Sequence, residues 1–181
     1  MEMTEAVKTT WAIDPAHTEI QFKVRHMMLS TVTGSFAAFN GTLETERDDF
    51  ANADIQFTAY VDSISTGEAQ RDTHLKSDDF FAADRYPELR FHSMTFMPQS
   101  DNAYQMRGEL TIRDQTRPIT LAVIYHGTAV DPYGQTKAGF EMTGTISRKD
   151  FGLQWNAMTE AGGVVVGDEV RLVMNVQLIR Q

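Results

Sequence analysis

The sequence predicts an all-β fold, an antiparallel barrel of about eight strands with one helical insertion near residues 67–84. Three observations predict it. Apolar and polar residues alternate with a period of two in most segments, turn residues separate those segments, and one long polar stretch breaks the pattern. Each segment has one apolar face that must be covered, and a sheet that closes on itself covers it without a second layer. A flattened sandwich is the alternative architecture.

The alternating segments predict strands along most of the chain. Apolar residues alternate at Ile20, Phe22 and Val24, and the same pattern recurs at 53–61, 106–113, 138–147 and 170–178. Segment 117–126 carries apolar residues on both faces, so we expect something to cover its outer side. Segment 89–97 is ambiguous, and we expect a bulge in it. Turns are predicted at 39–42 (FNGT), 130–135 (VDPYGQ) and 160–163 (EAGG).

The polar stretch from Thr66 to Phe91 predicts the helix. Ser65 and Glu68 have the spacing of a capping box, in which a serine side chain accepts from a free backbone N–H and a glutamate reaches back. We therefore expect the helix to begin there. Pro87 ends any helical continuation.

One face of this helix is charged. Helical spacing brings together Arg71, His74, Leu75 and Asp78, so the only large apolar residue shares its face with charged groups. Such a helix covers a dry core poorly but suits the mouth of a barrel. The adjacent Phe80 and Phe81 would anchor it.

Composition limits the classes of function. A net charge of −9 argues against nucleic acid as a partner, because that binding depends on clustered basic residues. The chain has no cysteine, which excludes disulfides and thiolate chemistry. Its first residues lack the pattern of a secretory signal, and no segment has the length of a membrane helix. We expect a cytoplasmic protein that does not span a membrane.

No catalytic motif is present at a readable spacing. The five histidines are scattered, and lone histidines are more often structural than metal ligands. We therefore expect no metal, no cofactor and no enzymatic activity. The alternative is an enzyme that acts on a lipid-like substrate, with His26, His74 or Asp150 as acid or base at the barrel mouth.

The apolar face combines small residues with flexible ones. Small side chains leave room, and methionines line it adaptably, as in a ligand cavity. A filled core, in which methionine occupies the gaps, explains the same composition. The residues concerned are Ala53, Ala59, Gly108 and Gly144, with Met106, Met142 and Met174.

Basic residues in two polar stretches are candidates for binding a head group. Arg71 and Lys76 would either hold an anionic or carbonyl group or fasten the helix to the barrel by ion pairs. The second stretch, SRKDFGLQW at 147–155, is either a structural turn or a basic patch at the opening, with Arg148 as its candidate.

Four stretches match a known family in its order along the chain: IDPAHTEIQFKVRHMMLSTVTGSFAAFNGTL at 13–43, RDTHLKSDDFFAADRYPELRFHS at 71–93, GELTIRDQTRPITL at 108–121 and GTISRKDFG at 144–152. The chain resembles the YceI-like family, lipocalin-like barrels associated with binding polyisoprenoids and other long-chain amphiphiles. The resemblance implies an extended eight-stranded antiparallel barrel around a long apolar tunnel, with the helical insertion beside it. Many relatives are exported, whereas this chain shows no leader.

We therefore expect residues 1–181 to form a single lipid-binding barrel domain. It would sequester or carry a long-chain amphiphile, such as a polyisoprenoid, an isoprenoid quinone-like molecule, a fatty acid or a fatty amide. Arg71, Lys76 and Arg148 would meet the head group. A module with a filled barrel is a further alternative, and base rate favours a homodimer. The tail would lie among Phe22, Val24, Ile55, Phe57, Ala59, Met106, Leu110, Phe140, Met142, Gly144 and Met174.

Overall fold

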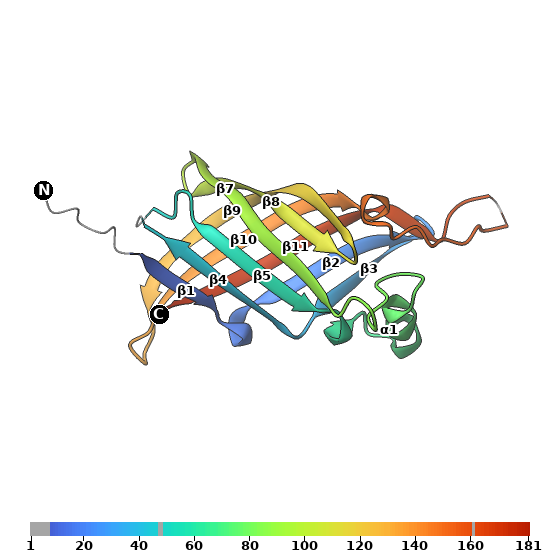
Figure 1. The fold of residues 1–181 in the computed structure, drawn as a ribbon, viewed down its shortest axis with the longest axis horizontal. Helices are drawn as coiled ribbons and strands as arrows, with labels where there is room; N and C mark the ends of the chain where they lie inside the picture. Colours follow the sequence, from blue (N-terminus) through green and yellow to red (C-terminus); the bar gives the residue numbers. More distant parts are fainter. Residues whose placement is uncertain (1–7, 47–48, 161) are drawn as a thin grey trace, which may run out of the picture.

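The computed structural model describes residues 8–46, 49–160 and 162–181, and its strands form one continuous sheet (Figure 1). No helix among these residues is long and apolar enough to cross a membrane. The strands are β1 (Thr9–Ile13), β2 (Glu19–His26), β3 (Ser30–Phe36), β4 (Phe39–Thr45), β5 (Asp54–Tyr60), β6 (Ile64–Ser65), β7 (Glu88–Ser100), β8 (Ala103–Ile112), β9 (Gln115–Val130), β10 (Thr136–Ser147) and β11 (Val166–Arg180).

The sheet closes into an eight-stranded antiparallel barrel, as the sequence predicts. Closure occurs along β11, which pairs with β10 on one edge and with both β1 and β2 on the other. At two positions in the ring, two short strands take the place of one long strand. β1 and β2 lie one after the other along β11, and β4 and β3 lie one after the other along β1 and β2. The short β6 continues β5 beside β3.

The alternating segments all lie in strands, and the expected bulge is present. The register of β7 against β8 shifts between Ser93 and Thr95, and again between Pro98 and Ser100.

The expectation that another segment covers the outer side of 117–126 is wrong, because Ile124 on that side is 47% exposed. Of the predicted turns, 130–135 joins β9 to β10. The turn at 160–163 lies in the segment before β11, although position 161 falls outside the described residues.

The predicted turn at 39–42 is wrong, because these residues begin β4. Its glycine serves close packing. A Cβ on Gly41 would lie 2.7 Å from Cδ1 of Ile13 and 3.2 Å from the carbonyl oxygen of Gln56. The chain bends instead at positions 37 and 38, between β3 and β4.

The insertion contains one helix, α1 (Ala69–Lys76). Elsewhere in the described ranges lie three short 3-10 helices, η1 (Pro15–His17), η2 (Val61–Ser63) and η3 (Arg148–Phe151). The predicted capping box is wrong. Ser65 belongs to β6, where it is paired with Ser35, and the helix begins four residues later. Glu68 is itself the N-cap, and its carboxylate accepts from the backbone N–H groups of Gln70 and Arg71 at 3.1 and 2.6 Å.

Aromatic residues fill one end of the barrel. Phe50 lies in contact with Trp11, Tyr125 and Phe140, at ring-centroid distances of 5.2 to 5.6 Å. Phe96 packs at right angles to Phe140. We call Trp11, Phe50, Phe96, Tyr125 and Phe140 the aromatic plug. Its members except Tyr125 are 5% exposed or less, so this end of the barrel is a packed core.

The opposite end is covered by the helical insertion and by the segment that follows β10. In Figure 1, α1 lies at the same end of the barrel as the loop before β11, whereas the C-terminus lies at the other end. Strand direction agrees with this, because β10 runs from the plug residue Phe140 toward Ser147. The barrel therefore has a filled end and a mouth.

Candidate functional site

A cavity of about 380 Å³ occupies the barrel between the plug and the mouth. Its wall is almost wholly apolar and comes from strands around the whole ring. Several inward side chains here are only half-buried, although they point into the barrel, because the cavity exposes them. Phe96 and Phe140 in the plug are 0% and 2% exposed by contrast. The residues with this internal exposure are Phe22, Val24, Ile55, Phe57, Leu110, Ile119, Ile146, Leu172 and Met174.

Most residues expected to hold the tail line this cavity. They are Phe22, Val24, Ile55, Phe57, Ala59, Met106, Leu110, Met142 and Met174, and they come from β2, β5, β8, β10 and β11. Period-two alternation places them correctly because every second residue of a barrel strand faces the interior.

Two of the expected tail residues do not line the cavity. Phe140 belongs to the aromatic plug, one layer too deep. Gly144 faces inward, but a Cβ there would lie 2.5 Å from Cδ2 of Leu121 and 3.1 Å from the carbonyl oxygen of Thr120. The glycine therefore makes room for a neighbouring wall residue and not for a ligand.

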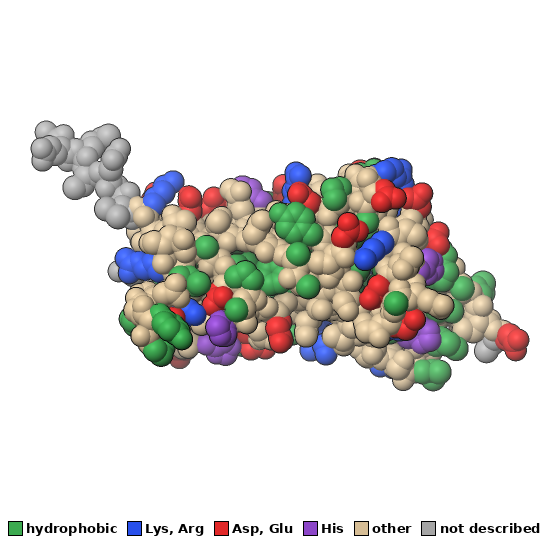
Figure 2. Space-filling model, turned by 90° about the horizontal axis from the view of Figure 1, so that it is seen from below, with side chains coloured by type: hydrophobic (Ala, Val, Ile, Leu, Met, Phe, Trp, Pro, Cys, Tyr) green, Lys and Arg blue, Asp and Glu red, His purple; other side chains and the backbone are tan. Residues whose placement is uncertain are grey.

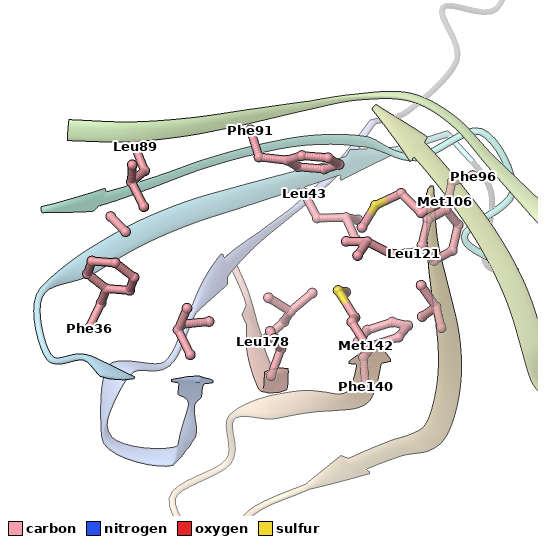
Figure 3. Packing of buried hydrophobic residues seen from close by; sticks show 14 of the residues in the cluster. Phe36, Leu43, Leu89, Phe91, Phe96, Met106, Leu121, Phe140, Met142 and Leu178 are labelled. Carbon is pink, nitrogen blue, oxygen red and sulfur yellow. The ribbon is translucent and has the colours of Figure 1, made fainter. Parts of the chain in front are cut away.

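Flexible side chains form the floor of the cavity. Figure 3 shows Met106 and Met142 reaching into the interior from different walls, with Phe96 and Phe140 on the plug side of them. Both methionines line the cavity, yet they are only 1% and 8% exposed. These thioether side chains, with packed aromatic rings behind them, close the cavity at the plug end. Because methionine side chains are flexible, this closed end can adapt slightly to a ligand.

Aromatic contacts hold the insertion over the mouth. Phe81 packs edge-on against Phe36 at 6.3 Å, and Phe80 lies 5.4 Å from Trp155. His74 contacts both Phe80 and Trp155, at 5.1 and 4.7 Å between ring centroids. Since Trp155 belongs to the segment after η3, these rings join the two segments that cover the mouth. Phe80 and Phe81 thus anchor the insertion, as expected.

Arg71 lies on the mouth side of the cavity wall, in a small polar network. Its Nε donates to Thr66 Oγ1 at 2.7 Å, and its Nη2 donates to the Thr66 carbonyl at 2.8 Å. Thr66 in turn donates through both its N–H and its hydroxyl to Asp72. These bonds fix the guanidinium through Nε and Nη2, and they use only part of its five N–H donors.

Arg148 also lines the cavity, but its donors are occupied by the protein itself, so its expected role as a head-group contact gains no support here and stays a prediction. The side chain is 3% exposed and donates to four backbone carbonyls, those of Gly167, Leu153, Trp155 and Val166. Nη2 also lies 3.5 Å from Asp168, so all five donors have partners. Burial lowers the pKa of Arg148, while the charge of Asp168 raises it. The residue fastens the segment 153–167 to the end of β10.

Lys76 is not among the residues that line the cavity, because it ends α1 on a different face from Arg71. The expectation that Lys76 meets a head group therefore stays a prediction that the cavity lining does not support. Of the three basic candidates, only Arg71 combines a place on the cavity wall with donors that remain for a ligand.

The groups considered for acid–base chemistry are spread around the mouth. His74 Nε2 lies 2.8 Å from Asp79 Oδ2, and His26 lines the rim. Asp150 is exposed on η3, where its backbone carbonyl accepts from Arg117. Within the described ranges, no three His, Cys, Asp or Glu residues are arranged to hold a metal ion. A His–Asp pair orients an imidazole, but catalysis by it would also need a nucleophile or a bound water.

Sequence reasoning did not single out several mouth residues. Trp155 is the clearest case, because a lone tryptophan in a polar segment gives no periodic signal. Phe36 and Thr66 lie in or beside strands β3 and β6, which are too short or too irregular for the alternation to be read. The contacts of Trp155 and Phe36 with the insertion, and the hydrogen bonds of Thr66 within it, reveal their places.

Comparison with known proteins agrees with this architecture. The model of the YceI-like domain family matches residues 11–178. UPF0312 proteins of Staphylococcus epidermidis and Staphylococcus aureus are each 35% identical to the chain over 164 residues, which is 90% of this chain and 93% of theirs.

Several solved structures of other proteins share this fold. The YCEI protein of Campylobacter jejuni superimposes with a TM-score of 0.73 at 28% identity, over 99% of both chains. BcnA of Burkholderia cenocepacia has a TM-score of 0.79 at 22% identity, covering 91% of this chain and 98% of its own. A polyisoprenoid binding domain from Saccharophagus degradans has a TM-score of 0.71 at 13% identity, over 94% and 98%, and shares the fold. The chain therefore belongs to the YceI-like family.

Proposed function

We propose that the protein sequesters or carries a long-chain amphiphile, with the tail in the cavity and the polar group at the mouth. The observation that carries the proposal is the blind apolar cavity of about 380 Å³ with a polar rim at its open end. That volume lies within the range of about 300–1,000 Å³ found for small-molecule pockets. An empty apolar cavity of this size would cost the fold packing energy, so retaining it suggests that it is filled in use.

The shape favours a ligand with a single extended tail. Burial of each CH₂ group is worth about 0.8 kcal/mol, so a tail of about fifteen carbons would gain roughly 12 kcal/mol before association costs. Apolar walls discriminate chain length weakly, by about 1–3 kcal/mol per methylene. The ligand class is therefore a polyisoprenoid, an isoprenoid quinone-like molecule, or a fatty acid or amide. The methionine floor would accept small differences in tail length.

Arg71 is the residue proposed to meet the polar group. It lies on the cavity wall, and its guanidinium keeps donors beyond the two bonds to Thr66. A charged head group leaves water only when it finds partners, and a planar guanidinium suits carboxylate or phosphate. Phosphate and carboxylate heads fit equally well at this position.

The experiment is organic extraction of the purified protein followed by mass spectrometry. We expect the extract to contain one class of single-tailed lipid, at close to one molecule per chain. The same extraction of the variant Met174→Trp should yield none of this lipid. Recovery of chemically converted lipid would instead favour catalysis by His74 and Asp79. Absence of lipid, together with no uptake of added fatty acid, would contradict the proposal and favour an interaction module.

A further inference from the structure

Two hairpin tips beside the mouth carry large apolar side chains in the open. Leu29 and Met28, in the turn between β2 and β3, are 78% and 64% exposed. Met158 and Val164, which pair across the hairpin before β11, are 77% and 43% exposed. A single exposed apolar residue is ordinary on a protein surface, but two adjacent tips made of them are not.

The two tips are joined and lie at the cavity entrance. The backbone N–H of Met27 donates to the carbonyl of Val165 at 2.8 Å. His26, which precedes Met27, and Val165 itself both line the cavity. The exposed apolar residues therefore continue outward from the cavity wall. In Figure 2, hydrophobic side chains are exposed at the end of the molecule away from the N-terminus, which is the mouth end in Figure 1, as well as elsewhere on this face.

The tips are held in place by side chains behind them. Arg25 donates from Nη2 to the Met28 carbonyl at 2.9 Å and from Nη1 to Thr31 Oγ1 at 3.1 Å. Asn156 closes the other hairpin, because its Oδ1 accepts from the backbone N–H groups of Ala157, Val165 and Val166. Both tips thus present their apolar side chains from braced turns.

We propose that this surface, formed by Met27, Met28, Leu29, Met158 and Val164, docks the mouth of the barrel onto the surface of a lipid bilayer. The proposal rests on the proposed function, since an amphiphile with a long tail is stored in a bilayer and reaches the cavity most directly from it. Apolar side chains on a braced turn would enter the boundary between head groups and acyl chains. The cavity would then open toward the layer that holds its ligand.

The bilayer expected here is a neutral one. The chain carries a net charge of −9, so the protein as a whole is not attracted to anionic lipid. Binding would depend on apolar contact and would change little with salt concentration. This separates the proposal from attachment through a basic patch.

The test is flotation of the full chain with phosphatidylcholine vesicles. We expect Leu29→Glu/Met158→Glu to lower the bound fraction about tenfold or more, because two charges enter an apolar layer. The matched control is Val130→Glu/Tyr133→Glu. It adds the same charges to residues that are 68% and 90% exposed at the turn on the plug end, and it should bind vesicles like the unchanged protein.

A second measurement keeps this test separate from the proposed function. Fatty acid added from an ethanol stock should bind both double variants equally, while its extraction from vesicles slows only in the mouth variant. Equal vesicle binding by both variants, or none by the unchanged protein, would overturn the docking surface even if fatty acid still binds. If sedimentation shows that the unchanged protein is a dimer and that Leu29→Glu/Met158→Glu is a monomer, the surface binds a second copy of the chain, and the bilayer proposal is overturned. Vesicle binding without fatty-acid uptake would support docking and count against the proposed function.

Discussion

Replacing Arg148 with alanine should destabilise the protein by about 3–5 kcal/mol, because four backbone carbonyls lose their charged donor. The structure supplies the reason. The guanidinium is 3% exposed and donates to the carbonyls of Gly167, Leu153, Trp155 and Val166 at 2.6 to 3.3 Å. Hydrogen bonds from a charged donor are worth about 1.5–3 kcal/mol each, and the total stays below their sum because carbonyls near the rim regain water.

The assay is urea unfolding of the ligand-free protein, followed by tryptophan fluorescence. The chain has two tryptophans, Trp11 in the plug and Trp155 at the mouth, so the variant Trp155→Phe separates the signals of the two ends. We expect Arg148→Ala to shift the midpoint for both ends, and the Trp155 signal to begin changing at a lower urea concentration. Arg148→Lys should recover only part of the loss, because an ammonium has three donors and no planar fork.

Lys149→Ala is the matched control for this change. Its ammonium forms an exposed ion pair with Asp168 at 3.3 Å, and such pairs contribute about 0–1 kcal/mol. A clamp role for Arg148 also predicts that Arg148→Ala weakens binding of an anionic amphiphile and of its neutral analogue alike. Stability equal to that of Lys149→Ala, combined with a loss confined to the anionic ligand, would refute the clamp and restore the head-group role.

The remaining predictions concern the head group, the cavity wall and acid stability. Arg71→Ala should weaken an anionic amphiphile about tenfold more than a neutral one in a binding titration, with little change in melting temperature, whereas Lys76→Ala should change neither. Gly144→Trp should fail to fold or melt far lower by circular dichroism, because its Cβ would already lie 2.5 Å from Leu121; normal melting with lost ligand would show that Gly144 borders the cavity. Burial alone would raise the pKa of Asp14, but hydrogen bonds from His17 and Lys137 outweigh it and hold the pKa below 3.8. A depressed carboxylate pKa stabilises the fold fully above the unfolded pKa, and that contribution is lost as the pH falls through the folded pKa. The stability advantage over Asp14→Asn should therefore begin to shrink below about pH 4 in urea titrations and vanish once the pH lies below the folded pKa of Asp14. An advantage that persists below that range would contradict this.

Period-two alternation predicted the long strands because each has one face in the barrel and one in water. It predicted most of the cavity wall for the same reason, as with Ile55, Phe57 and Met174. It could not separate layers along the barrel axis, so Phe140 was grouped with the cavity although it belongs to the plug. Depth within a barrel depends on strand stagger, which the alternation of a single strand does not contain.

The mouth was harder to predict than the wall. Both Arg71 and Arg148 occur in polar stretches that interrupt the pattern, yet one borders the cavity and the other clamps a loop. The difference lies in backbone carbonyls contributed by residues up to 19 positions away, a distance at which no periodic signal exists. The cytoplasmic location, the homodimer and the lack of a metal or cofactor stay predictions, to be checked by cell fractionation, sedimentation and metal analysis.

Titration of a fluorescent single-chain fatty acid into delipidated protein tests the central claim most directly. The unchanged protein should bind it saturably, with one site per chain. Met174→Trp, which fills the cavity from β11, should abolish binding while the free energy of unfolding changes by less than about 1 kcal/mol, since the new ring occupies empty space. Ile124→Trp on the outer face should bind normally. Equal, saturable binding by all three proteins would place the ligand outside the barrel and contradict the account.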